Sequence, residues 1–146
     1  MNNLDRFISV QKYVYEEALT EVKQGNKKSH WMWFIFPQII GLGESDTAIY
    51  YSIVNIEEAT KFLSHEILGK RLREITSELL KLKTNDPEEI FGEIDAVKLK
   101  SSMTLFDCVE ENSIFDEVLK KYFNGQRDEL TLNKLDQQKH MRKLWE

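Results

Sequence analysis

The chain has 146 residues, 41% hydrophobic and 31% charged, a balance that excludes wholesale disorder and predicts one globular domain. Its formal net charge of −5 argues against nucleic acid as a partner, because contacts with phosphates need clustered lysine and arginine side chains. Cys108 is the only cysteine, and the longest apolar run, Trp31 to Phe36, is far shorter than the ~20 residues of a membrane-spanning helix. These features predict a cytoplasmic protein without membrane attachment.

The first predicted element is an amphipathic helix from Leu4 to Val22. Its apolar residues recur at helical spacing, and its charged residues, Glu21 among them, fall mostly on the opposite, solvent-facing side. Gly25 is a suitable residue to end this helix, because glycine adopts the left-handed conformation without strain.

An irregular aromatic segment follows over residues 27–43. It reads KKSHWMWFIFPQIIGLG, and its apolar residues fit neither a period of two nor one of 3.6. Pro37 disfavours helical geometry at Phe36. We therefore expect a short buried helix or an extended piece here, followed by a turn through Gly41 and Gly43.

Helical patterns return in the middle of the sequence. Asn55 and Glu58 resemble the polar pair that caps a helix N-terminus, ahead of an apolar series that begins at Ile56. A longer helix is predicted over residues 66–83, with leucine and isoleucine side chains facing inward. The turn at residues 85–87 contains a proline that suits the first position of a further helix.

Three further helix starts are predicted in the C-terminal part. Asp95, Ser113 and Asp128 are residue types that cap helices well, and each precedes a helical pattern. No internal repeat or linker separates these pieces. The sequence therefore predicts an all-α, compact single-domain fold, in which residues 1–125 form a helical domain and residues 126–146 form a charged C-terminal helix or tail.

The aromatic segment contains side chains suited to binding a planar ligand. The rings of Trp31 and Trp33 can stack on a nucleobase, and the neighbouring His30 can transfer a proton near neutral pH. Gln38 can hydrogen-bond to an amide or a base edge. The alternative is that the aromatic residues belong to the core and His30 is a hydrogen-bonded structural residue, which is the commoner role of such residues.

A second segment, IDAVKLKSSMTLF, suits the binding of an anion. On one helix, Asp95, Lys98, Ser101 and Ser102 approach each other through spacings of three and four residues. A lysine beside hydroxyl groups can hold a phosphate or a carboxylate. In the alternative interpretation Asp95 is a plain helix cap, Lys98 is solvated and the hydroxyls bond to the backbone of their own helix.

Arg71 is a third candidate because it lies close to Gly69. A glycine inside a helical pattern often marks close packing or the approach of a ligand. Arg71 can hold an anion through two N–H groups. The commoner outcome for such an arginine is an ion pair with Glu74 or Glu78 on its own helix.

Several common chemistries have no support in the sequence. The three histidines and the single cysteine are not spaced as zinc ligands. Walker, GxGxxG and GxSxG motifs are lacking. Cys108 lies on an apolar helix face without a basic neighbour in sequence, which predicts an inert buried thiol. We therefore expect no metal ion and no cofactor.

Three runs in this order, SHWMWFIFPQIIGLG, EATKFLSHEILGKRL and IFGEIDAVKLKSSMTLF, resemble the bacterial family catalogued as domain of unknown function 1810. The resemblance extends from about Leu4 to Gly125 and implies a compact, mainly α-helical domain. It implies no catalytic residues. Polar residues within these runs, Thr104 included, are less readily explained as solvent-exposed residues without a function. The resemblance therefore favours one site shared by the aromatic and serine-lysine segments.

The chain departs from the pattern of this family at Glu66 and in the charged tail after Gly125, which lies outside the resemblance. Glu66 stands where this family usually has proline, which loosens the case for a rigid turn at His65. The chain also weakly resembles NADAR-type proteins, which cleave N-glycosidic bonds in ADP-ribose-like compounds. The Glu-His-Tyr helix motif of that group is not visible here, so this second similarity is weak.

Three functions remain open at this point. The first is binding of a small phosphorylated, ring-bearing ligand of the nucleotide or ADP-ribose type, contacted by Trp31, Trp33, Gln38, Arg71, Lys98, Ser101, Ser102 and Thr104. The second is N-glycosidase catalysis on ADP-ribose-related compounds, with Asp95 as the catalytic carboxylate and His30 assisting. The third is a helical protein-interaction module without catalysis. The sequence does not indicate an oligomeric state.

Overall fold

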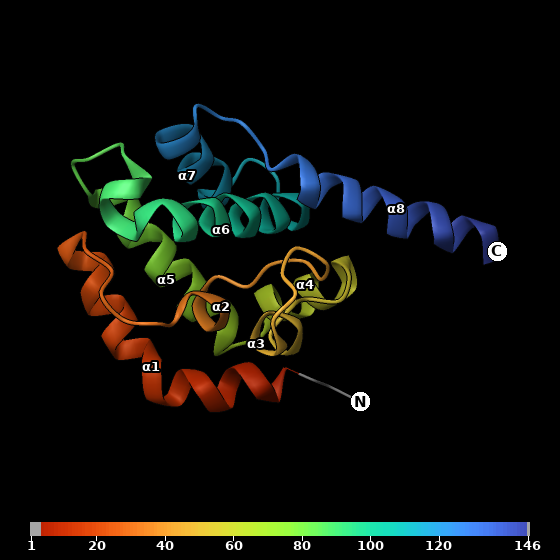
Figure 1. The fold of residues 1–146 in the computed structure, drawn as a ribbon, viewed down its shortest axis with the longest axis horizontal. Coiled ribbons are helices and arrows are strands. Elements are labelled where there is room, and N and C mark those ends of the chain that lie inside the picture. The colour runs from red at the N-terminus through yellow and green to blue at the C-terminus, as the bar shows by residue number, and fades with distance from the viewer. Residues whose placement is uncertain (1–3, 146) are drawn as a thin grey trace.

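Helices joined by short loops make up the computed structural model, which describes residues 4–145 (Figure 1). In chain order they are α1 (Asp5–Gln24), α2 (Met32–Ile35), α3 (Asp46–Tyr50), α4 (Ile56–Ser64), α5 (Leu68–Lys81), α6 (Pro87–Val109), α7 (Ile114–Phe123) and α8 (Glu129–Trp145). Over these described residues the only β-pairing is an isolated parallel bridge between Ile39 and Ile53. The predicted all-α fold is confirmed.

The helix boundaries follow largely from local signals. Gly25, at φ 71°, ends α1 in the left-handed conformation, as predicted. At the start of α4 the Asn55 side chain accepts a hydrogen bond from the Glu58 backbone N–H at 2.9 Å. At the start of α8 the Asp128 carboxylate accepts from the Thr131 backbone N–H at 3.0 Å. Each bond satisfies a donor that the first turn of a helix would otherwise leave unpaired.

The prediction that Asp95 caps a helix is wrong. The cap of α6 is Asp86, which accepts from the Glu88 N–H at 2.9 Å ahead of a proline in the first turn. Within α6 the chain leaves helical geometry at Gly92, where φ is 80° and ψ is 168°, and then resumes its helical course. Asp95 therefore lies in the first turn of the second part of α6, where its carboxylate is available for ion pairs.

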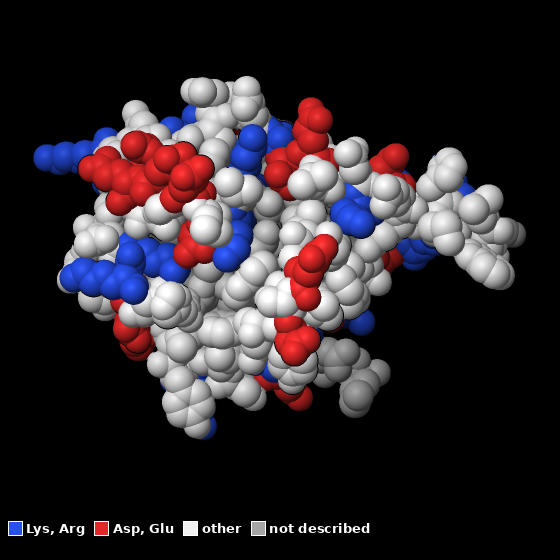
Figure 2. All heavy atoms as spheres, in the orientation of Figure 1, with Lys and Arg blue, Asp and Glu red and all other residues white. Residues whose placement is uncertain are grey.

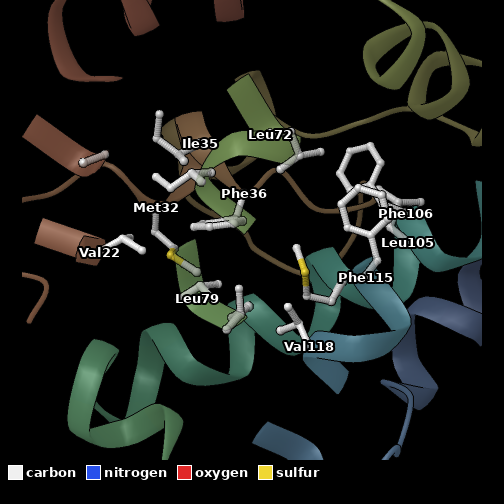
Figure 3. Close-up of a cluster of buried hydrophobic side chains, with 14 of the residues drawn as sticks. Val22, Met32, Ile35, Phe36, Leu72, Leu79, Leu105, Phe106, Phe115 and Val118 are labelled. Carbon is white, nitrogen blue, oxygen red and sulfur yellow. The ribbon is translucent and has the colours of Figure 1, made fainter. Parts of the chain in front are cut away.

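The core lies between α1, α2 and the four helices α4, α5, α6 and α7. Figure 3 shows Met32, Ile35 and Phe36 of the aromatic segment reaching into the same apolar cluster as Leu72 of α5 and Phe115 of α7. All five side chains are buried. Full burial of such a side chain stabilises the fold by about 1.5–3 kcal/mol. Much of the aromatic segment is therefore core, and only part of it can serve a binding site.

Gly69 lies where α4 and α5 meet most tightly. A Cβ atom at this position would lie 1.9 Å from the carbonyl oxygen of Leu63 and 2.8 Å from its carbonyl carbon. The close-packing interpretation of this glycine is therefore correct. Because the obstacle is backbone, it cannot rotate away.

We expect Gly69→Ala to lower the free energy of unfolding by about 2 kcal/mol or more, because the two helices must separate to admit the methyl group. Urea denaturation measures the change. Lys70→Ala is the control, since Lys70 is the exposed next residue of the same helix and should show little effect. Alanine is the better helix former by about 1 kcal/mol, so a stabilised Gly69→Ala protein would contradict the expected clash.

Candidate functional site

Lys98 and Trp33 bring the two segments chosen from the sequence into contact. The Lys98 ammonium of α6 lies 4.5 Å from the centroid of the Trp33 ring of α2. Trp33 is half-buried, and it packs over Gly43, where a Cβ atom would lie 3.0 Å from the ring. A cation over an aromatic face contributes about 0.5–2 kcal/mol, depending on how far it is desolvated. The contact gives α2 and α6 one shared surface.

Asp95 lies between two lysines at this surface. Its Oδ2 atom is 2.8 Å from Lys27 Nζ, and its Oδ1 atom is 3.1 Å from Lys98 Nζ. Burial alone would raise the pKa of Asp95, but the hydrogen bonds from Lys27 and Lys98 outweigh burial and hold the pKa below its usual value. Asp95 is therefore ionised at neutral pH, and it holds both ammonium groups in place.

Lys27 is a site residue that we did not single out from the sequence. Its side chain is only 7% exposed, although lysine is almost never buried without a partner. The Nζ atom bonds to Asp95 and to the Ser29 carbonyl oxygen at 2.5 Å, and it lies 5.0 Å from the centroid of the Trp31 ring. The sequence feature that could have identified Lys27 is its position at the start of the aromatic segment. With Lys27 included, one carboxylate, Asp95, bridges two ammonium groups.

Glu21 of α1 fixes the start of the aromatic segment. Its carboxylate accepts hydrogen bonds from the backbone N–H groups of Lys28 at 2.7 Å and Ser29 at 3.0 Å, from the Ser29 hydroxyl at 2.7 Å, and from Trp31 Nε1 at 2.9 Å. Burial would raise the pKa of Glu21, but these bonds lower it to about 2. Trp31 is 1% exposed, so its indole anchors the segment and its ring faces are covered by protein.

The other residues predicted from the aromatic segment form no hydrogen bond or ion pair with Lys27, Asp95 or Lys98 within the described chain. His30 is exposed to solvent. Gln38 is buried, and its backbone carbonyl oxygen accepts a hydrogen bond from the Ile53 backbone N–H at 2.8 Å. Its side-chain Nε2 atom has no hydrogen-bond partner among residues 4–145. The sequence-based prediction grouped His30, Trp31 and Gln38 with Trp33 in one site. In the structure His30 is exposed, whereas Trp31 and Gln38 are buried.

The three hydroxyl residues predicted on α6 are buried. Ser101 donates to the Val97 carbonyl at 3.2 Å, as the alternative interpretation expected of a hydroxyl within a helix. Thr104 donates to the Lys100 carbonyl at 2.8 Å and accepts from the backbone N–H at the start of α8 at 2.9 Å. Ser102 is fully buried, and its Oγ atom has no partner within the described chain. Thr104 therefore joins α6 to α8.

Arg71 belongs to a second group of contacts, between α1 and α5. Its guanidinium lies 5.1 Å from the Tyr15 ring centroid and donates to the Gln11 side chain at 3.4 Å. Glu74, which the sequence spacing offered as its partner, accepts instead from the Tyr15 hydroxyl at 2.5 Å. Gln11 also donates to the Phe34 carbonyl at 2.9 Å, so this group touches α2 from the side of α1. Within residues 4–145 no hydrogen bond or ion pair links it directly to Lys98.

The surface over α2 and α6 is hollowed. Figure 2 shows a depression near the middle of the face in view, where Figure 1 places α2 opposite α6. Lysine or arginine atoms border it, with acidic groups close by. A groove of about 1220 Å³ lies elsewhere, between α8 and residues 40–57, and no residue predicted for the site lines it.

Two searches of the described chain found no further features. Among residues 4–145 no three His, Cys, Asp or Glu side chains lie close enough to bind a metal ion together. Every helix described is too short or too polar to cross a lipid bilayer.

Comparison with known proteins gives a family match and a close structural neighbour. Residues 1–135 match the family described as "Protein of unknown function (DUF1810)". The crystal structure of the conserved hypothetical protein Rv1873 from Mycobacterium tuberculosis is 43% identical in sequence, with a TM-score of 0.90. The similarity covers 92% of this chain and 97% of that chain. A search of curated proteins found no match.

Proposed function

The chain belongs to the DUF1810 family, and from the chemistry of its α2–α6 surface we propose that it binds a small phosphorylated ligand with a planar ring, of the nucleotide or ADP-ribose type. One observation carries the proposal: the Lys98 ammonium lies 4.5 Å over the Trp33 ring, at a surface that also holds Lys27. Aromatic rings bind planar groups by stacking, and lysines bind phosphate. The two chemistries meet at one place.

Lys98 is the group that would contact an anionic ligand. Asp95 is ionised and pairs with both lysines, and the ionised Glu21 is bound to the neighbouring Ser29 and Trp31, so the attraction comes from the partly exposed Lys98 ammonium itself and not from a net positive charge. The ion pair with Asp95 also holds the nearly buried Lys27 ammonium in position before a ligand arrives, which reduces the entropy lost on binding. An incoming phosphate would draw Lys98 from the Trp33 ring and free that face for the ring of the ligand.

Tryptophan fluorescence tests binding directly. The chain has three tryptophans, and Trp145 is 84% exposed, so Trp145→Phe should serve as the background that removes non-specific quenching. We expect AMP and ADP-ribose to quench the remaining emission through Trp33, and adenosine to do so much more weakly because it lacks phosphate. A folded protein whose emission stays constant across this panel would rule out the proposed site.

Substitution of Lys98 tests the anion contact. We expect Lys98→Gln to weaken binding of whichever of these compounds binds by about tenfold, the cost of one charge-assisted hydrogen bond, as measured by titration calorimetry. Lys121→Gln is the matched control. Lys121 Nζ lies 5.3 Å from the centroid of the Tyr122 ring on α7, so this substitution removes the same kind of cation–aromatic contact away from the site. Equal affinities for wild type and Lys98→Gln would contradict the assignment.

N-glycosidase activity on the same compounds is a second candidate, favoured by the ionised state of Asp95. A carboxylate can stabilise the positive charge that develops on a sugar when its N-glycosidic bond breaks, and such catalysis is worth about 10²–10⁴-fold. Asp95→Asn should then abolish release of the base, whereas Asp95→Glu should retain part of this activity. Chromatography of the reaction mixture measures the released base. Equal rates in wild type and Asp95→Asn would rule out this role.

Asp95→Asn should also lower the free energy of unfolding. The substitution leaves the nearly buried ammonium of Lys27 without its carboxylate partner. Rates must therefore be compared per folded molecule, with the folded fraction followed by circular dichroism.

A further inference from the structure

The C-terminal half of α8 is an arm with unusual surface chemistry. In Figure 1 this half of α8 projects beyond the rest of the molecule. The side chains of Met141, Leu144 and Trp145 are exposed along it. Residues 137–145 contain no acidic residue, and their basic residues are Lys139, Arg142 and Lys143. The arm is thus basic and apolar in a chain that is acidic as a whole.

The surface beside the base of this arm has the complementary chemistry. Residues 29–60 contain no lysine or arginine but four acidic residues. Two of these, Glu44 and Asp46, are exposed and form no ion pair with any residue the structure describes. Ile49 and Tyr50 beside them are 51% and 61% exposed. We call residues 40–58 the acidic face.

Within one chain the arm covers this face only in part. Gln138 of α8 donates to the Val54 carbonyl at 2.8 Å, and Arg142 forms an ion pair with Glu57. Between these polar contacts runs the groove of about 1220 Å³, with apolar lining from both sides that includes Ile40 and Met141. The last turn of the arm extends past these contacts, so its apolar residues stay exposed although a matching surface lies nearby.

We propose that two copies of the chain associate through this side, each laying the tip of its α8 arm on the acidic face of the other. In Figure 1 the arm extends from the same end of the molecule at which α3 and α4 lie. A single two-fold axis at this end would make both contacts at once. Lys139 and Lys143 would then meet Glu44 and Asp46. The apolar side chains at the tip of the arm would cover those of α3, with Trp145 as the aromatic anchor typical of interfaces.

This pairing accounts for two features that the isolated chain leaves unexplained. Met141, Leu144 and Trp145 are exposed at helical spacing on the arm, and Ile49 and Tyr50 are exposed on the acidic face. Clustered exposed apolar side chains of this kind often mark interaction sites. The two surfaces also carry opposite charge, which favours an arm-to-face contact over contact between two basic arms. The proposal does not depend on the ligand proposed above, whose surface lies over α2 and α6.

The test is the molar mass of the full chain in solution, followed by sedimentation from micromolar to millimolar concentration. We expect a reversible dimer that high salt weakens. Trp145→Ser on the arm and Ile49→Ser on the acidic face should each raise the dissociation constant by about tenfold or more. Tyr13→Ser is the control, because Tyr13 is an equally exposed aromatic residue on α1, away from both surfaces, and should leave the dimer unchanged.

Mixing the two variants gives the decisive result. A chain with an intact arm (Ile49→Ser) and a chain with an intact face (Trp145→Ser) retain one complete contact between them. The mixture should therefore form more dimer than either variant alone. The proposal is overturned if the wild type is monomeric at millimolar concentration, if Ile49→Ser dimerises as well as the wild type, or if mixing restores nothing.

Discussion

Replacing Arg127 by methionine is expected to lower the free energy of unfolding by about 3 kcal/mol. Arg127 Nη2 lies 2.9 Å from Asp107 Oδ2 and 2.7 Å from Asp116 Oδ1, and Nη1 donates to the Gly125 carbonyl at 2.8 Å. Both carboxylates are buried. Without the guanidinium Asp107 would lose its only ion-pair partner among residues 4–145, and Asp116 would keep only Lys120, at 3.0 Å. Removing one partner of a buried ion pair costs about 3–5 kcal/mol, and less where water reaches the arginine, as here.

A matched control separates this effect from the general loss of an arginine. Arg73 also holds one carboxylate through two bonds, to Glu110 at 2.8 Å and 3.0 Å, but both side chains are 42% exposed. Arg73→Met should therefore cost only about 0.5–1 kcal/mol. Urea denaturation of both variants at neutral pH measures the difference. Similar losses in the two proteins would show that burial of the Arg127 carboxylates does not govern stability.

The same site predicts how the difference depends on pH. Hydrogen bonds from Lys120 and Arg127 hold the pKa of Asp116 below its usual value of 3.8. A carboxyl group whose folded pKa is lowered stabilises the fold above its unfolded pKa and loses that contribution as the pH falls through the folded value. The gap between wild type and Arg127→Met should therefore be full at neutral pH and shrink below about pH 4.

Helix ends were the part of the fold that the sequence predicted well. Gly25, Asn55 and Asp128 act through bonds to the nearest few residues, so their chemistry is visible in the local sequence. The five-residue helix α3 was not predicted, because one turn carries too few residues to show a period. The interruption at Gly92 was also missed, although the proline of the turn at residues 85–87 correctly marked the start of α6.

The candidate site was only partly predictable, because spacing indicates a side chain's direction but not its distant partner. Trp31 and Trp33 were grouped as two stacking rings, yet residues two apart on a helical turn point in opposite directions. The structure accordingly buries Trp31 and leaves Trp33 half-buried beneath Lys98. Lys27 was overlooked because its partner, Asp95, is far away in the sequence.

Glu21 shows the same limit and gives the second large effect. The pattern of α1 placed it on the solvent side, whereas the structure buries it against the backbone of Lys28 and Ser29. Periodicity cannot reveal that a following loop folds back over a polar face. We expect Glu21→Gln to lower the free energy of unfolding by about 2–3 kcal/mol at neutral pH, since charge-assisted hydrogen bonds contribute about 1.5–3 kcal/mol each and the amide keeps some of them.

Acid titration distinguishes a charged anchor from a merely well-packed one. Because the folded pKa of Glu21 is about 2 against an ordinary 4.5, its contribution is fully present above about pH 4.5 and is lost as the pH falls toward 2. Wild type and Glu21→Gln should therefore differ most at neutral pH and converge near pH 2, measured by urea denaturation across the range. Glu16→Gln, at an exposed position of the same helix, should follow the wild type throughout. If the difference in the free energy of unfolding stayed constant down to pH 2, the shape of the Glu21 side chain, and not its charge, would account for its contribution to stability.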